Sequence, residues 1–266
     1  MQSSASTELD NAAEMLRLLG YATLDSGVAL DEIQGLRRQF DDLHSSVLST
    51  HGEVALREID EHHTIRCPLA HDRKFLELAL NPRVLALCER LIGKGFILNQ
   101  QNGIINPSHG ETYAQDAWHR DLPYQHFVSS RPLALNALFC LDDFTAENGA
   151  TLVLPASHKE EAMPSDATIR STERAVTAVA GSFIILDCMT YHRGGCNRSD
   201  GPRRAVNHVF TIGLMRQQID LPLFLGDRYA EEPAIRRLLG FDFRTPESTA
   251  AFYSERRRRK KGRPLA

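Results

Sequence analysis

The pattern of apolar and polar positions divides the chain into a helical first third and a strand-rich remainder. In residues 31–44 apolar side chains recur at helical spacing from Ile33 to Leu43, and Asp31 stands where it could cap the start of the helix. The other candidates in this part are helices at 12–19, ending at Gly20, and at 72–91, broken or restarted at Pro82, with a short strand at 21–24. The first third is therefore predicted to be mostly helical.

From Gly95 onward short apolar runs alternate with turn signals such as Asn106-Pro107 and Asp200-Gly201-Pro202. The predicted strands are 96–105, 133–141, 151–154, 175–179, 182–187 and 204–214, and a weak helical pattern follows at 233–239. Many short strands between turns are typical of a β-sandwich or barrel, and helices that precede them are expected to pack outside it. The predicted class is α+β, with one domain over 1–255 and a basic tail over 256–266.

Composition supports a single domain and reveals a charge asymmetry. With 266 residues, 42% of them hydrophobic, the chain can bury one substantial core. Residues 256–263 read RRRRKKGR, and the formal net charge of −3 becomes −10 when these seven positive charges are removed. An acidic body is a poor partner for a polyanion, so no nucleic-acid partner is expected, and the tail is interpreted as a solvated, mobile end.

The cysteine pattern and the length of the apolar runs indicate in which cellular compartment the protein is expected. The five cysteines are scattered without a CxxC pair, which indicates neither a disulfide framework nor a zinc knuckle. Cys88, Cys140 and Cys188 lie in apolar runs and are predicted to be buried. The first residues are polar and acidic, and no apolar run approaches the roughly 20 residues that span a bilayer. A reducing cytoplasm and no membrane partner are expected.

One histidine stands out among eleven. His119 is followed by Asp121, and side chains at i and i+2 of an extended segment point to the same face, within reach of one metal ion. The motif alone is weak, because His51-Gly52-Glu53 and His109-Gly110-Glu111 have the looser form of it by chance. Seven other histidines are predicted to be ordinary surface residues, either solvated or hydrogen-bonded: His44, His51, His62, His63, His71, His109 and His126. His208, within a strand, is expected to be a satisfied core histidine.

A third ligand is available beyond the apolar strand 182–187, where His192 follows. Two histidines and one carboxylate, with open positions, form the facial triad that suits Fe(II) oxygenases. Arg203, eleven residues further on, begins another strand, and a buried guanidinium there needs an anion. A structural salt bridge is the alternative for Arg203. Arg204 is its rival, and only one of the two can face the metal because they point to opposite faces.

At these residues the chain resembles the phytanoyl-CoA dioxygenase family over about residues 10–215. The family pattern W-H-x-D is matched by Trp118, His119 and Asp121, and a distal block of His, Asn and Arg by His192, Asn197 and Arg203. Residues 148–159, NGATLVLPASHK, resemble a third family segment, in which His158 belongs to a turn and is not a ligand. The chain departs from the family at Ala156, in place of the usual glycine, and at Asn106, where many relatives carry lysine. Ala205 leaves no serine two residues after Arg203, a pairing that is seen in some other oxygenase families.

The resemblance implies a double-stranded β-helix of the cupin type, with Fe(II) held by His119, Asp121 and His192. It implies 2-oxoglutarate as cosubstrate, anchored by Arg203, with Asn102 and Gln100 as further candidate contacts. The expected reaction uses O₂, releases succinate and CO₂, and hydroxylates or otherwise oxidises a small-molecule substrate. Relatives that halogenate have a small residue in place of the carboxylate, so Asp121 favours hydroxylation or desaturation.

Three alternatives stay open, and the substrate is undetermined. They are a cupin-type metalloenzyme that does not use 2-oxoglutarate, a degenerate barrel that serves as a binding module, and a nucleic-acid-modifying oxygenase that depends on the basic tail. Residues 122–131, with Tyr124, Gln125, His126 and Phe127, either line a substrate entrance or form a surface loop. No basic cluster near the motifs suggests a CoA phosphate site, which favours a small polar or natural-product metabolite. The sequence does not indicate an oligomeric state.

Overall fold

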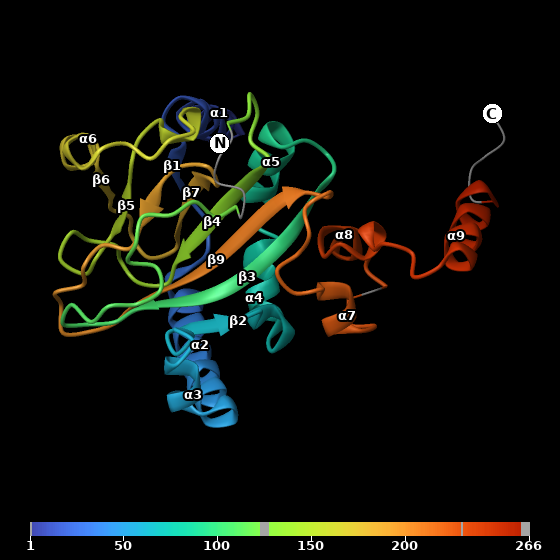
Figure 1. Cartoon of the computed structure of the whole chain (residues 1–266), viewed down its shortest axis with the longest axis horizontal. Helices are drawn as coiled ribbons and strands as arrows, with labels where there is room; N and C mark the ends of the chain where they lie inside the picture. Colours follow the sequence, from blue (N-terminus) through green and yellow to red (C-terminus); the bar gives the residue numbers. More distant parts are fainter. Residues whose placement is uncertain (1, 123–127, 230, 262–266) are drawn as a thin grey trace.

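Two antiparallel β-sheets face each other in the computed structural model, which describes residues 2–122, 128–229 and 231–261. The larger sheet has the strand order β1-β7-β4-β9-β3-β2, and the smaller has the order β6-β5-β8 (Figure 1). The strands are β1 (Tyr21–Asp25), β2 (Thr64–Arg66), β3 (Phe96–Asn106), β4 (Ala134–Cys140), β5 (Thr151–Val153), β6 (Arg174–Val176), β7 (Ser182–Asp187), β8 (His192–Arg193) and β9 (Arg203–Ile212). The predicted α+β class and double-stranded β-helix are confirmed.

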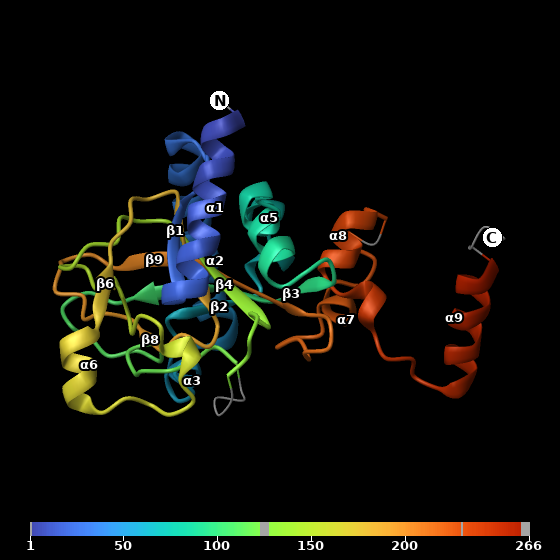
Figure 2. The same ribbon diagram turned by 90° about the horizontal axis from the view of Figure 1, so that it is seen from above.

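Helices cover the outer face of the larger sheet, with α1, α2, α4 and α5 gathered on one side of it (Figure 2). The helices are α1 (Gln2–Leu19), α2 (Leu30–His51), α3 (Glu53–Arg57), α4 (Arg73–Ala79), α5 (Pro82–Leu91), α6 (Asp166–Thr172), α7 (Leu221–Leu225), α8 (Pro233–Leu238) and α9 (Thr249–Lys261), with short 3₁₀ turns η1 (Pro68–Ala70), η2 (Ser157–Lys159) and η3 (Phe241–Phe243). The helices and the sheet share one core that includes Leu16, Phe40, Phe75, Leu87, Phe139, Phe183 and Phe210. No described helix is long and apolar enough to cross a membrane.

Strand β7 explains why the run 182–187 has no polar alternation. Phe183 and Ile185 belong to the core beneath the helices, whereas Ile184 and Leu186 pack toward the smaller sheet with Val153. Alternate side chains thus enter two different apolar layers, and both faces of the strand are covered. This two-sided burial fits an interior strand, and β7 pairs with β1 on one side and with β4 on the other.

The helix boundaries differ from the sequence-based expectation at one residue and agree at another. The prediction that Asp31 caps α2 is wrong: the helix begins at Leu30 after Ala29, and Asp31 lies in its first turn. A carboxylate there still interacts favourably with the helix dipole. Pro82 is the first residue of α5, and the Asn81 side chain caps it by accepting from the backbone N–H groups of Arg83 and Val84. The restart at Pro82 is confirmed.

Gly149 is required where the turn after β4 meets the loop after β8. Its φ is +76°, and a Cβ placed on it would lie 2.4 Å from the Gly195 carbonyl oxygen and 2.5 Å from Asn106 Nδ2. Asn106, one of the departures from the family pattern, donates from its side-chain amide to the carbonyl oxygens of Gly149 (3.2 Å) and Gly195 (2.8 Å). This asparagine therefore has a structural role in joining the two loops.

Gly149→Ala is expected to lower the free energy of unfolding by about 1–3 kcal/mol, because alanine is strained at this φ and its Cβ has no space. Urea denaturation would measure the loss. Gly201→Ala is the matched control, since a Cβ on Gly201 would meet no neighbouring atom and its φ is not positive. An equal effect of the two substitutions would contradict the packing argument.

Residues 256–261 of the basic segment lie in the last turns of α9, which stands apart from the two sheets in both views (Figures 1 and 2). The expected boundary at 255/256 falls inside this helix, and residues 262–266 lie outside the described residues. The five cysteines are free, and Cys88, Cys140 and Cys188 are buried as predicted.

Candidate functional site

A short antiparallel bridge brings His119 and His192 together. The backbone N–H of each donates to the carbonyl oxygen of the other at 3.0 Å, and the Asp121 N–H donates to the Cys188 carbonyl oxygen at 3.0 Å. The two imidazole centroids are 4.4 Å apart. Residues 119–121 thus run beside residues 188–192, and three side chains from separate parts of the chain converge on one point.

The three side chains present ligand atoms within 4.8 Å of one another. His192 Nε2 lies 3.6 Å from Asp121 Oδ1. A facial set of ligands at metal distances of about 2.0–2.2 Å has neighbouring atoms about 3 Å apart, so a small inward adjustment suffices to hold an ion. This is the geometry that the motif and its distal partner predicted.

Hydrogen bonds orient each of the three groups. Nδ1 of His119 lies 2.8 Å from the Ala117 carbonyl oxygen, and Nδ1 of His192 lies 2.9 Å from that of Thr190. A ring that donates from Nδ1 keeps the Nε2 lone pair for a metal. Asn136 Nδ2 donates to Asp121 Oδ2 at 2.9 Å, which leaves Oδ1 for the ion. The donor set therefore fits a divalent iron.

Burial lowers the pKa of His192, with the neighbouring Asp121 acting in the opposite direction. A neutral imidazole is the form that binds a metal. Desolvation by the surrounding core thus favours the ligating state of this residue near neutral pH.

Asp187, at the end of β7, is a second buried carboxyl group near the site. Its Oδ1 accepts from the Met189 N–H at 2.9 Å, which shapes the turn leading to His192. Burial raises its pKa to about 6, against 3.8 for an ordinary aspartate. The folded protein therefore retains a proton between about pH 4 and 6 that the unfolded chain releases.

The free energy of unfolding should consequently fall by up to about 3 kcal/mol from this group as the pH rises from 4 to above 6. Asp187→Asn removes the titration and keeps the Oδ1 acceptor. Urea denaturation at pH 5 and pH 8 should show a smaller decrease in the variant than in the wild type. The same pH dependence in both proteins would show that Asp187 is not the group responsible.

Arg203 lies in the same cavity as the two imidazoles, at the start of β9. Arg203 is 3% exposed, and its guanidinium lies 3.8 Å from the centroid of the Phe144 ring. Its Nε has no hydrogen-bond partner in residues 2–122, 128–229 and 231–261. Burial lowers its pKa, and the Tyr113 hydroxyl is a hydrogen-bonding neighbour. Among the described residues it has no carboxylate partner within ion-pair distance. A buried cation in this state attracts an anionic ligand.

The rival Arg204 points to the opposite face of β9. Its Nε lies 2.9 Å from Asp142 Oδ2 and its Nη1 lies 2.6 Å from Asp41 Oδ2. Arg204 is thus the structural ion pair, and Arg203 is the arginine that faces the candidate metal ligands. The register of β9 in the sheet decides between them, which the sequence left open.

Asn102 and Gln100 share a face of β3 with Ile104, which lines the cavity, but neither of them lines it. The Asn102 amide instead lies 3.2 Å from Arg66 Nη1, on the neighbouring strand β2, and 3.2 Å from Gln218 Oε1. Their predicted contact with the cosubstrate stays a prediction. Tyr124, Gln125, His126 and Phe127, expected at a substrate entrance, lie outside the described residues.

Two polar residues of the site were missed from the sequence. Asn136 interrupts the otherwise apolar strand β4, and a lone amide in a buried strand is a signal that could have drawn notice. Tyr113 is on the loop before His119 and lines the cavity. A Cβ on Gly194 would lie 1.7 Å from its hydroxyl oxygen, so Tyr113 fits only because residue 194 is glycine. No local pattern marks Tyr113.

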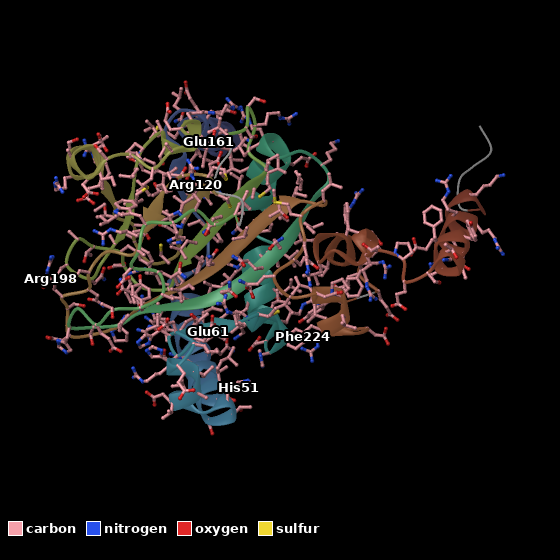
Figure 3. The ribbon with its side chains drawn as sticks, in the orientation of Figure 1. His51, Glu61, Arg120, Glu161, Arg198 and Phe224 are labelled. Carbon is pink, nitrogen blue, oxygen red and sulfur yellow. The ribbon has the colours of Figure 1, made fainter. Side chains whose placement is uncertain are left out.

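Arg120, between the two ligands of the motif, faces away from the cavity and is buried. Its guanidinium lies 4.0 Å from the Tyr191 ring centroid and donates to the carbonyl oxygens of Ser157 (2.9 Å) and Glu161 (3.2 Å), and Figure 3 labels Arg120 close to Glu161. His158 of that turn hydrogen-bonds the Arg17 carbonyl oxygen and is outside the metal cluster. Arg120, which follows His119, therefore connects Tyr191, which precedes His192, to the turn that contains Ser157.

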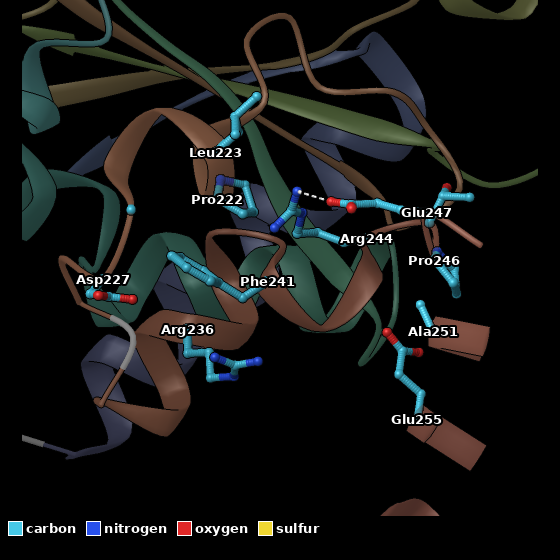
Figure 4. Close-up of a pocket in the computed structure, with 12 residues that line it drawn as sticks. Pro222, Leu223, Asp227, Arg236, Phe241, Arg244, Pro246, Glu247, Ala251 and Glu255 are labelled. Atoms are coloured by element: carbon cyan, nitrogen blue, oxygen red, sulfur yellow. Dashed lines mark ion pairs between the residues drawn. The ribbon is translucent and has the colours of Figure 1, made fainter. Parts of the chain in front are cut away.

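A larger hollow of about 450 Å³ lies between α7, η3 and α9 and contains none of the predicted site residues (Figure 4). Leu223, Phe241 and Glu255 line it, and an ion pair of 3.8 Å joins Arg244 to Glu247 at its edge. The hollow is open to solvent, and neither of the two described clusters of potential metal ligands lies in it. The candidate site is therefore the smaller cavity between the sheets.

Comparison with known proteins shows the family of the chain. Residues 16–205 match the family described as "Phytanoyl-CoA dioxygenase (PhyH)". "Uncharacterized protein Rv1501" of Mycobacterium tuberculosis (strain ATCC 25618 / H37Rv) is 30% identical over 253 residues, which cover 93% of this chain and 92% of that protein.

Two solved structures show the same fold. EctD from S. alaskensis with 2-oxoglutarate and 5-hydroxyectoine has a TM-score of 0.66 at 21% identity, covering 82% of this chain and 83% of that one. The epimerase SnoN in complex with Fe3+, alpha ketoglutarate and nogalamycin RO has a TM-score of 0.60 at 20% identity, covering 78% and 85%.

Proposed function

The chain belongs to the phytanoyl-CoA dioxygenase family within the Fe(II)/2-oxoglutarate-dependent oxygenases, and we propose that it is an active enzyme that hydroxylates a small-molecule metabolite. The observation that carries the proposal is the convergence of three oriented ligand groups beside a cavity that His119, His192 and the buried Arg203 line, where Arg203 has no ion-pair partner among the described residues. Succinate and CO₂ are the expected coproducts, and O₂ is the oxidant.

His119, Asp121 and His192 hold the iron in this proposal. A bound Fe(II) supplies the oxidative chemistry with O₂ and 2-oxoglutarate. The protein keeps both Nε2 atoms and Asp121 Oδ1 directed at one point through the carbonyl oxygens of Ala117 and Thr190 and through Asn136. The carboxylate at position 121 favours hydroxylation or a related oxidation over halogenation.

Arg203 anchors the distal carboxylate of 2-oxoglutarate in this proposal. Its guanidinium is held by Phe144 and Tyr113 before any ligand arrives, which reduces the ordering cost of binding. A bidentate contact with a carboxylate would satisfy the buried cation and exclude water from that end of the cavity. SnoN and EctD are solved with alpha ketoglutarate and 2-oxoglutarate, respectively, which supports the choice of cosubstrate.

The experiment that tests the function is an anaerobic titration of the Fe(II)-loaded protein with 2-oxoglutarate, followed by exposure to O₂ with a panel of metabolites. We expect a weak visible charge-transfer band on titration and substrate-stimulated release of succinate. Metal retention without any response to 2-oxoglutarate would favour the cupin-type alternative. Failure to retain metal would favour a binding module.

We propose that residues 1–255 form the oxygenase domain and that the basic segment 256–266 is not part of the catalytic machinery. Deleting residues 256–266 should change succinate formation by less than about twofold, because α9 stands apart from the cavity that holds the candidate ligands. Succinate assays of the truncated and full chains would measure the effect. Loss of activity on truncation would instead support a nucleic-acid substrate bound through the tail.

A further inference from the structure

A second group of potential metal ligands lies outside the cavity, where the start of β2 meets the loop after β3. His62, His63 and Glu111 each present a ligand atom, and these atoms lie within 4.8 Å of one another. Glu111 Oε1 is 3.2 Å from His63 Nε2 and 3.7 Å from His62 Nε2. The cluster has the same composition as the first site, two imidazoles and one carboxylate, but no residue in common with it.

His62 does not behave as an ordinary surface or hydrogen-bonded histidine, so the sequence-based expectation for it is wrong. The residue is 9% exposed, and neither of its ring nitrogens has a hydrogen-bond partner within the part of the chain that the structure describes. His63 Nδ1 is also buried and has no partner among the described residues. A buried polar atom left unsatisfied costs about 1–3 kcal/mol. The side chain of His62 therefore has an unused nitrogen close to a carboxylate, where a cation would satisfy it.

The backbone holds the two imidazoles in place before any ion binds. The Ile105 N–H donates to the His63 carbonyl oxygen at 3.0 Å, and His44 Nε2 lies 2.7 Å from the His62 carbonyl oxygen. The two rings lie with centroids 4.0 Å apart. Burial lowers the pKa of His63, which favours the neutral form that binds a metal.

The spacing matches a tetrahedral zinc ion. Zn–N and Zn–O bonds of about 2.0–2.1 Å at tetrahedral angles place neighbouring ligand atoms about 3.3 Å apart. The two separations from Glu111 Oε1, 3.2 and 3.7 Å, bracket that value. The Glu111 side chain is 45% exposed, so a fourth position would be open to water.

We propose that His62, His63 and Glu111 form a second, zinc-binding site. Arg57 Nη1 lies 3.3 Å from Glu111 Oε1 and competes with the ion for this carboxylate. Its Nε and Nη2 are already bonded to Glu53 at 3.0 and 2.9 Å, and the arginine is exposed. Zinc would take the place of the hydrogen bond between His63 Nε2 and Glu111 Oε1 and leave Arg57 with Glu53.

Zinc binding at this site would restrain the loop 107–118 by linking it to the start of β2. Glu111 is two residues before Tyr113, which lines the cavity and hydrogen-bonds Arg203. The same loop ends at the ligand His119, and the Gly194 N–H donates to its Gln115 carbonyl oxygen at 2.7 Å. An ion at the second site would thus restrain the loop that supports one wall of the first.

Zinc titration of the full-length, metal-free chain tests the proposal. The wild type should bind about two equivalents, since the first site also suits zinc, and Glu111→Gln and His62→Ala should each bind about one. Glu58→Gln is the matched control, because Glu58 is an exposed carboxylate outside the cluster and undergoes the same change of charge. Arg57→Ala, which removes the competing cation, should bind the second equivalent at least as tightly as the wild type.

Hydrogen exchange gives a readout that does not depend on counting zinc. Amides of residues 110–116 should exchange at least about threefold more slowly with zinc in the wild type and in Glu58→Gln, and unchanged in Glu111→Gln. If Glu111→Gln and the wild type bind the same amount of zinc, the second site does not exist. A different result would separate the two proposals. If the wild type binds one equivalent of zinc and Glu111→Gln binds none, the second site exists and the metal centre of the proposed function is refuted instead.

Discussion

Asp121→Asn should leave the protein folded but reduce its affinity for Fe(II) by more than about a hundredfold, with succinate formation falling at least as far. The expected loss of affinity is larger than the 10- to 100-fold loss of metal affinity that follows when a residue hydrogen-bonded to a ligand, and not the ligand itself, is changed. Asparagine keeps the size of the side chain but removes the negative charge that balances the ion. Asp121 is nearly buried beside His192, so water cannot replace the lost charge effectively. Iron content after desalting and succinate release would measure the two effects.

A graded series separates ligand loss from general damage. Asn136→Ala removes the donor to Asp121 Oδ2 and should cost the smaller 10- to 100-fold. Asp166→Asn makes the same chemical change on exposed α6 and should have no effect on iron content. Circular dichroism would establish that each variant is folded. Retention of iron by Asp121→Asn at the wild-type level would show that this carboxylate is not a ligand.

Arg203→Met should raise the dissociation constant for 2-oxoglutarate by about thirtyfold or more, because truncating one partner of a buried charged pair costs about 2 kcal/mol or more. Methionine retains an apolar stem over Phe144 while removing the charge. In the absence of ligand the same change removes a buried cation without a carboxylate partner, so the free energy of unfolding should not fall. Anaerobic calorimetric titration with 2-oxoglutarate and urea denaturation would measure these two quantities.

Arg204→Met is the matched control, and its expected effects have the opposite pattern. The variant loses the ion pairs with Asp142 and Asp41, so the free energy of unfolding should fall by about 1–2 kcal/mol. Its affinity for 2-oxoglutarate should be unchanged, because Arg204 faces away from the cavity. If Arg204→Met weakened 2-oxoglutarate binding as much as Arg203→Met, the assignment of the two faces of β9 would be wrong.

Local patterns predicted the longer strands, the main helices of the first third and half of the candidate site, but not the helices α3, α6, α7 and α9. The apolar run in β7 and the helical spacing in α2 reflect burial that every neighbouring residue shares, so they are visible in a short window of sequence. His119 and Asp121 could be paired because they are two residues apart in extended backbone. The strands β2 and β8 were missed, since elements of three and two residues leave no measurable periodicity.

Contacts between distant parts of the chain were decided by the tertiary structure. The choice of Arg203 over Arg204 follows from the pairing of β9 with β3 and β4, and the position of Asn136 beside Asp121 follows from the packing of β4. Glu111 meets His63 across 48 residues because the chain turns back after β3. Strand register and loop closure depend on the whole core at once, whereas a motif records only its own neighbourhood. For this protein the sequence therefore determined which residue types could bind a metal, and the fold determined which of them meet.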